Sequence, residues 1–257
     1  MAHPRTDNNL VRARHLAVLA VAGFACVPAG AAGAAVVRAP GAAGPLGDEL
    51  LSNERTVTRF AYVNAQARVR SAPRASARTV GRLRYRTEDG PPEVYVALRS
   101  QLDAHDHVWL QVRLPKRPNG RRGWVPEEAL SQLRVVRTQL RINRKTLRAT
   151  LYRAGRRVWS SPIGVGKPST PTPAGRFYIR ERLRNLGGGG VYGPWAFGTS
   201  AYSRLSEWPG GGVVGIHGTD EPGLIPGRPS HGCIRMPNDR ISRLAKLMPV
   251  GTPVRIV

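Results

Sequence analysis

The sequence predicts a mainly β protein of one large or two small domains. Short β-prone runs follow one another from residue 57 almost to the end, turn residues (29 Gly and 22 Pro) separate them, and few segments have helical periodicity. The 257 residues are 41% hydrophobic and 22% charged, which is enough apolar material for a packed core. This composition excludes a disordered or collagen-like chain.

The first 34 residues predict a secretory signal peptide. Three arginines precede an apolar stretch at 16–27, and small residues at 29–34 offer cleavage sites. The apolar stretch is shorter than the roughly 20 residues that span a bilayer. We therefore expect export and cleavage rather than a membrane anchor, with lipid attachment at Cys26 as an alternative.

Residues 35–56 are rich in Ala, Gly and Pro and predict a flexible linker. Between 57 and 130, turn signals separate short β-prone runs, and this close spacing predicts a small β-barrel. The insert at 86–92 is interpreted as ordinary variation. His105 and His107 fit a solvated loop better than a metal site, because no third ligand lies near them in the sequence.

From residue 133 onward the pattern is again one of strands. Alternating apolar and polar residues at 147–160, around Ala154-Gly155, predict a hairpin with one buried face. Further strands are expected at 177–179, 213–216 and 254–257. Near the end, Asn238 is expected to cap one short helix.

The net charge of +24 suggests an anionic partner. However, 36 of the 40 basic residues are Arg and they are spread along the chain, a bias that the base composition of the coding DNA would also produce. Export excludes nucleic acid as the partner. The charge therefore predicts only weak, salt-screened attraction to anionic polymers.

After cleavage at residue 34 the chain keeps one cysteine, Cys233. It lies in the segment 230–236, which contains His231, and a second His-containing segment, 216–219, lies shortly before it. A thiol attacks as the thiolate, and a nearby imidazole can take its proton. Gly232 lets a substrate carbonyl approach the backbone, where the amides of Gly232 and Cys233 are candidate oxyanion donors. These residues suggest nucleophilic catalysis, with a buried, inert cysteine as the alternative.

The part of the chain that contains these two segments resembles the catalytic domain of L,D-transpeptidases, the peptidoglycan cross-linking enzymes of bacteria. The resemblance covers 133–257 and rests on Ser230-His231-Gly232-Cys233, with His217-Gly218 upstream. The segment 57–130 resembles the bacterial SH3-like domains of secreted wall proteins. Together they imply a small SH3-like β-barrel followed by an L,D-transpeptidase-type β-sandwich with one or two short helices.

The resemblance also implies roles for individual residues. Cys233 would be the nucleophile and His217 the general base, oriented by the carbonyl of Gly218. An oxyanion site would form around the nucleophile, lined by His231 and Gly232 and shaped by Ser230. Arg235 is implied to hold the substrate.

Four aromatic residues lie in Gly/Pro-rich segments around these motifs. They are expected either to cover the substrate as a lid, with Tyr202 and Trp208 as substrate contacts, or to anchor the loops to the core. The four are Tyr192, Trp195, Tyr202 and Trp208.

The implied reaction is a two-step acyl transfer on peptidoglycan stem tetrapeptides, through a thioester and with release of D-alanine. An amine of a neighbouring stem would complete a 3-to-3 cross-link, whereas water would make the enzyme an L,D-carboxypeptidase. No metal or cofactor is implied, and carbapenems are expected to acylate the thiol. The first domain is expected to bind a wall polymer. Deletion of residues 35–130 is therefore expected to spare acylation of a soluble stem peptide but to weaken retention on insoluble wall.

Two other readings compete with this one. His217, Asp220, His231 and Cys233 could ligate zinc as in a cell-wall peptidase, although the sequence lacks the catalytic Glu that such an enzyme needs. Alternatively, the protein would bind the wall without catalysis, through its first domain and its cationic surface.

Overall fold

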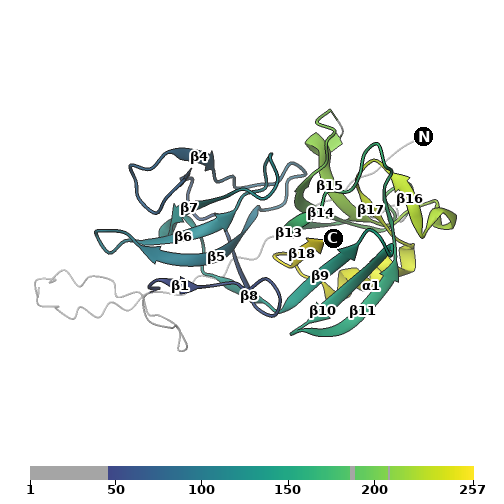
Figure 1. Cartoon of the computed structure of the whole chain (residues 1–257), viewed down its shortest axis with the longest axis horizontal. Coiled ribbons are helices and arrows are strands. Elements are labelled where there is room, and N and C mark those ends of the chain that lie inside the picture. Colours follow the sequence, from purple (N-terminus) through teal and green to yellow (C-terminus); the bar gives the residue numbers. More distant parts are fainter. Residues whose placement is uncertain (1–45, 186–188, 208) are drawn as a thin grey trace, which may run out of the picture. The chain divides into compact units, whose positions relative to one another are not determined.

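The computed structural model describes residues 46–185, 189–207 and 209–257. The expected signal peptide, Cys26 and Trp208 lie outside the described residues. The described part contains two β-sheets and one α-helix (Figure 1), which confirms the mainly β class. No helix in this part has the length and apolar character of a membrane span.

The first sheet has eight strands, ordered β4-β3-β7-β6-β5-β2-β8, with β1 paired to β5. The long strand β5 lies between β2 and β6 and is almost wholly buried. Its likeness to an SH3-like barrel stays a prediction. The strands are β1 Glu49–Leu50, β2 Thr58–Tyr62, β3 Arg68–Arg70, β4 Thr79–Arg82, β5 Val94–Leu102, β6 Val108–Arg113, β7 Arg122–Pro126 and β8 Arg134–Val136.

The second sheet has ten strands, ordered β11-β10-β9-β18-β13-β14-β15-β17-β12-β16. The helix α1, Asn238–Leu247, follows β17 directly in the chain. The strands are β9 Thr138–Asn143, β10 Arg148–Arg153, β11 Arg156–Pro162, β12 Gly164–Gly166, β13 Gly175–Arg184, β14 Trp195–Tyr202, β15 Val213–His217, β16 Gly227–Ser230, β17 Ile234–Arg235 and β18 Pro253–Ile256.

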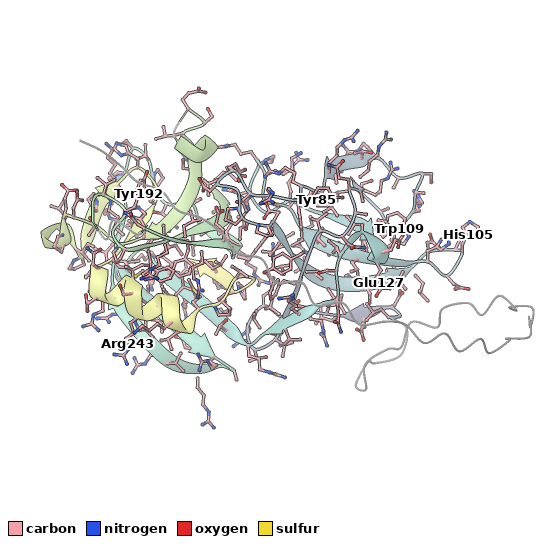
Figure 2. All side chains as sticks on the ribbon, turned by 180° about the vertical axis from the view of Figure 1, so that it is seen from behind. Tyr85, His105, Trp109, Glu127, Tyr192 and Arg243 are labelled. Carbon is pink, nitrogen blue, oxygen red and sulfur yellow. The ribbon has the colours of Figure 1, made fainter. Side chains whose placement is uncertain are left out.

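Turn chemistry explains the shorter connections. Ala154 and Gly155 both adopt left-handed backbone (φ 48° and 81°), which closes the hairpin between β10 and β11. His105 lies at the tip of the turn between β5 and β6 (Figure 2) and is exposed. Short 3₁₀ turns occur at Glu127–Ala129, Pro209–Gly212 and Pro222–Leu224.

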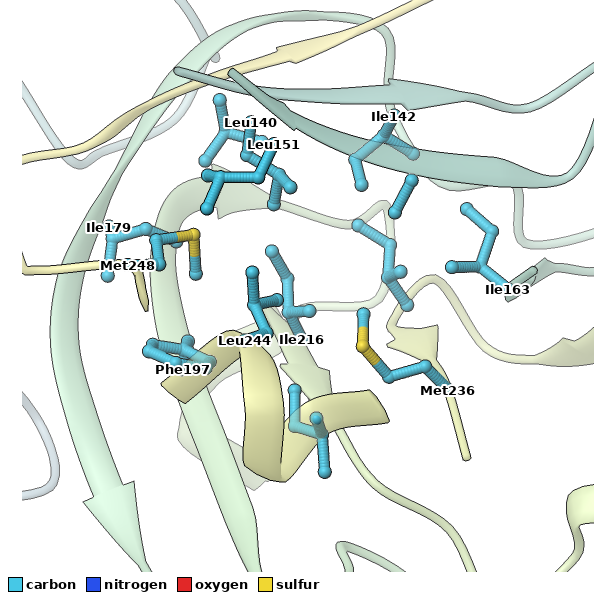
Figure 3. Close-up of a cluster of buried hydrophobic side chains, with 14 of the residues drawn as sticks. Leu140, Ile142, Leu151, Ile163, Ile179, Phe197, Ile216, Met236, Leu244 and Met248 are labelled. Atoms are coloured by element: carbon cyan, nitrogen blue, oxygen red, sulfur yellow. The ribbon is translucent and has the colours of Figure 1, made fainter. Parts of the chain in front are cut away.

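A buried apolar cluster inside the second sheet places the strands that carry the site (Figure 3). Ile216 of β15 and Ile234 of β17 are both fully buried in it and are register partners. The helix α1 contributes Leu244 to this cluster, while its neighbour Arg243 is exposed (Figure 2). Because Ile216 and Ile234 are fixed in the core, the residue directly after Ile216 and the residue directly before Ile234 are held in place.

The two sheets also share a buried apolar cluster, and the described residues fall in one compact unit. Tyr178 of β13 is fully buried among apolar side chains of the first sheet, and its hydroxyl donates to the carbonyl of Val94 at 3.0 Å. Beside it, the fully buried Arg180 donates to both carboxylate oxygens of Glu93. The expected domain boundaries stay a prediction.

Candidate active site

Cys233 and His217 line the same cavity, which has a volume of about 370 Å³. His217 ends β15, and Cys233 directly precedes β17, so the two neighbouring strands bring them together. A side chain added at Gly215 would meet the Cys233 sulfur at 3.7 Å and Cδ2 of the His217 ring at 3.6 Å. Glycine at 215 therefore leaves open the space that the sulfur and the imidazole both border.

The imidazole of His217 is held in one orientation. Its Nδ1 donates to the carbonyl oxygen of Gly218 at 2.6 Å, which leaves Nε2 as the unprotonated nitrogen of a neutral ring. The edge of the Tyr192 ring packs on it, with ring centroids 5.0 Å apart. This is the tautomer that a general base needs.

Burial sets the charge state of both groups. It lowers the pKa of His217 to about 4, outweighing the Gly218 carbonyl, which favours the protonated ring. Burial likewise raises the pKa of the Cys233 thiol, although the amide of Gly215 and the charge of Arg235 act the other way. At neutral pH the site therefore holds a thiol beside a neutral imidazole, not a preformed ion pair.

The turn before Cys233 is tied by a chain of buried hydrogen bonds. The Ser230 hydroxyl donates to the carbonyl of Cys233 at 2.6 Å and accepts from the amide of Gly232 at 3.1 Å. The Thr172 hydroxyl donates to the carbonyl of Gly232 at 2.8 Å and accepts from the amide of Gly166 at 2.9 Å. These bonds fix the backbone on both sides of the Gly232–Cys233 peptide.

The amide of Gly232 already has a partner within the turn, and its expected role at the oxyanion site stays a prediction. Its amide is already donated to Ser230, so in this state it is not a free oxyanion donor. Its φ of +129° lies in the left-handed region, and an added Cβ would stand 3.0 Å from the Cβ of Ser203. Glycine is therefore required here by backbone conformation and space.

Arg235 and His231 flank the cavity rather than line it. Arg235 is the register partner of His217, and its guanidinium binds Glu221 at 2.8 Å. Its positive charge lowers the pKa of both His217 and Cys233. His231 is half-buried and is absent from the cavity wall.

Tyr202 is absent from the lining of this cavity, and its expected role as a substrate contact stays a prediction. It is buried, with its hydroxyl donating to the carbonyl of Pro115 at 3.1 Å and with the guanidinium of Arg117 over its ring. Tyr202 thus anchors its loop. Tyr192 (Figure 2), in contrast, is half exposed on the cavity wall, as a lid residue would be.

Three residues at the site were not recognised in the sequence. Asn238, expected to cap α1, makes no capping bond; instead its side-chain oxygen accepts from the amide of Thr219 at 2.9 Å, just after His217-Gly218. Asp89, from the insert that looked like ordinary variation, and Arg184 both line the cavity. Nothing in the sequence places Asp89 near Cys233, because their proximity depends on how the sheets meet.

The alternative zinc site is not assembled. Within the described ranges, no three His, Cys, Asp or Glu side chains come together as a metal-binding group. Within the same ranges, the sulfur of Cys233 is a free thiol. The chemistry available at the cavity is therefore that of a thiol next to an oriented imidazole.

Known proteins are similar in sequence to the part of the chain that carries the candidate site. Residues 137–256 match the family model YkuD, an L,D-transpeptidase catalytic domain. Two proteins named "Putative L,D-transpeptidase YkuD" are similar: that of Bacillus subtilis (strain 168) is 42% identical over 45% of this chain and 62% of its own length, and that of Bacillus licheniformis is 40% identical over 47% and 64%. The matched part of the chain thus spans less than two thirds of the length of these curated relatives.

Solved structures include the catalytic domain of the Enterococcus faecium L,D-transpeptidase, determined by NMR. It is 26% identical, covers 47% of this chain and 96% of that chain, and has a TM-score of 0.35. The family match is local: it begins at residue 137, directly after β8, and contains both Cys233 and His217. Residues 137–256 are thus similar to the L,D-transpeptidase catalytic domains of the YkuD family.

Proposed function

We propose that the protein is an exported cysteine L,D-transpeptidase acting on peptidoglycan stem tetrapeptides. The observation that carries the proposal is the meeting of the Cys233 thiol and the oriented, neutral His217 ring at Gly215, on the wall of one cavity. A buried inert cysteine would need neither the cavity nor the imidazole.

In the first step, the sulfur of Cys233 attacks the carbonyl between the third residue and the terminal D-alanine. Nε2 of His217 takes the thiol proton as the C–S bond forms, because the raised pKa of the thiol and the lowered pKa of the imidazole disfavour earlier transfer. The amide of Cys233 is a donor for the resulting oxyanion. Collapse breaks the C–N bond, the imidazolium returns its proton to the leaving amine, and a thioester remains.

In the second step, an amine of a neighbouring stem attacks the thioester. His217 takes a proton from the attacking nitrogen and returns it to the departing sulfur, so the thiol is restored and a 3-to-3 cross-link is formed. Water in place of the amine gives a carboxypeptidase. The open cavity, with Tyr192 half exposed beside His217, leaves room for the second substrate.

Export and wall attachment belong to the same proposal. The basic and apolar pattern of residues 1–34 supports export to the cell wall or periplasmic space. On the first sheet, a hollow of about 670 Å³ has exposed basic side chains and no acidic residue on its lining. It suits an anionic wall polymer, and its basic residues are Arg68, Arg82, Arg84 and Lys116.

The proposed nucleophile is tested by Cys233→Ala in the mature chain. Wild type should release D-alanine from a stem tetrapeptide and gain the mass of the tripeptide acyl group, and also that of a carbapenem, on intact-protein mass spectrometry. Cys233→Ala should lose D-alanine release and both adducts, because no other described residue supplies a thiol.

Ser230→Ala is not a suitable control, since its hydroxyl shapes the same turn. A matched control is Ser206→Ala, an exposed hydroxyl change outside the cavity wall. D-alanine release by Cys233→Ala would refute the assignment. A wild-type chain that binds peptidoglycan without ever releasing D-alanine would instead establish the non-catalytic wall-binding alternative.

A further inference from the structure

The wall of the Cys233 cavity includes a residue of the first sheet. Asp89 lies on the loop 86–92 between β4 and β5, yet it lines the cavity together with Cys233. The loop is closed on itself: the amide of Thr87 donates to the carbonyl of Pro91 at 2.9 Å, and the Arg86 guanidinium donates to the carbonyl of Gly90 at 2.7 Å. Asp89 is therefore presented by a built turn.

The two residues before Asp89, Thr87 and Glu88, attach this turn to the second sheet. The hydroxyl of Thr87 donates to the carboxylate of Glu181 in β13. The carboxylate of Glu88 accepts from the fully buried Arg180 at 2.8 Å and from the hydroxyl of Tyr202 at 3.2 Å. Because Thr87 and Glu88 are held in this way, the exposed Asp89 is fixed at the cavity wall.

The lining of the cavity carries one carboxylate and one guanidinium, that of Arg184. Asp89 is the only carboxylate among its lining residues. Glu181 is only 2% exposed and lies behind Gly198, where an added Cβ would come within 2.1 Å of its carboxylate oxygen. Burial first, and then the charge of Asp89, raise the pKa of Glu181 to about 7. The inner carboxyl thus holds a proton over much of the acidic range, while the outer one faces the cavity.

We propose that Asp89 binds a primary ammonium group of the substrate, with Glu181 behind it as a positioning residue. This rests on the proposed function, in which an amine takes part in the reaction. The ammonium has two possible sources of the same chemistry: the side chain of the third residue of the donor stem, or the amine of the acceptor stem.

Binding is measured first, independently of turnover, with Cys233→Ala as the background. The ligands are a tetrapeptide with lysine at its third position and the same peptide acetylated on that amine, which removes the charge. Adding Asp89→Asn should weaken binding of the lysine peptide roughly tenfold or more, the loss expected for a charge-assisted hydrogen bond. The acetylated peptide should bind both variants equally.

Turnover then separates the two sources. With an otherwise wild-type chain and the donor alone, Asp89→Asn should raise KM for the lysine donor and leave kcat close to wild type if Asp89 binds the donor. If it binds the acceptor, hydrolysis of an acetylated donor is unchanged and KM for an added amine acceptor rises. Either pattern supports the ammonium site and assigns its source.

Asp106→Asn is the matched control, since it makes the same change at an exposed aspartate outside the cavity wall. The inference is overturned if Asp89→Asn and Asp106→Asn bind the lysine peptide equally and show the same KM for donor and acceptor. A failure of the proposed function is distinguishable from this, because it would be a wild-type chain that releases no D-alanine while the binding comparison still reports on Asp89.

Discussion

At the scale of single residues, the site is defined by two groups whose burial keeps them neutral. His217 has a lowered pKa because its ring is buried, and Cys233 has a raised one for the same reason. The hydrogen bond from Nδ1 of His217 to the Gly218 carbonyl fixes which nitrogen accepts a proton. In the proposed reaction, activation of the Cys233 thiol therefore depends on general-base transfer during attack rather than on a resting thiolate.

This state predicts the pH dependence of acylation. The reactive form has an unprotonated His217, so the rate should hold through pH 5 to 8 and fall only as the pH drops through about 4, where the ring becomes protonated. Stopped-flow acylation by a carbapenem at constant ionic strength measures it. An acid limb with a midpoint near 6.5, the value of an ordinary histidine, would show that burial does not control this group.

At the scale of elements, the site depends on bonds between segments that are distant in the sequence. Thr172, in the connection between β12 and β13, joins the amide of Gly166 to the carbonyl of Gly232 and is almost fully buried. Asn238, the first residue of α1, holds the amide of Thr219. The turn of the nucleophile and the end of β15 are therefore positioned from outside their own strands.

Thr172→Val tests this positioning role. Valine has nearly the same shape but leaves a buried amide and a buried carbonyl without this partner, so the free energy of unfolding should fall by roughly 1–3 kcal/mol. Acylation should slow in kcat more than in KM, because the thiol is displaced while the cavity remains. Thr172→Ser keeps the hydroxyl and should restore kcat; equal kcat in the two variants would contradict the role.

The sequence was informative where chemistry is local and silent where it is not. The segment containing Cys233 and His217 could be identified because two histidines, each followed by glycine, and one cysteine lie there within a short stretch of sequence. Asn238 was interpreted as a helix cap because its neighbours along the chain form a helix, yet its partner is Thr219 from another element. Asp89 could not be predicted, since its place depends on the docking of two sheets.

At the scale of the whole molecule, the first sheet supports the second sheet, which carries the candidate site. It covers Tyr178 and pairs Glu93 with Arg180, both members of the pair being fully buried. Arg117 donates to the carbonyl of Ser203 at 3.0 Å, and Ser203 in turn lies against Gly232. The expectation that removing the first domain would spare acylation does not fit these contacts.

Glu93→Gln should therefore destabilise both sheets together. The substitution leaves the buried Arg180 with Glu88 as its remaining carboxylate, so the free energy of unfolding should fall, with roughly 3–5 kcal/mol for a fully broken buried pair as the upper bound. Urea unfolding followed by tryptophan fluorescence and by circular dichroism should show one shared transition at a lower midpoint. Glu127→Gln, at a partly exposed position in the 3₁₀ turn after β7, is the control, and separate transitions for the two signals would argue that the sheets fold independently.

The docked turn at 86–92 has a consequence for protein engineering. A designer who transplants residues 137–256 onto a new carrier would carry the thiol and the imidazole but leave behind Asp89, which lines the cavity, and the hydrogen bond that Arg117 donates to the Ser203 carbonyl. A working chimera would have to import both loops along with the transplanted segment. Substrate preference could accordingly be retuned by redesigning a few positions in the accessory half, without touching the chemistry.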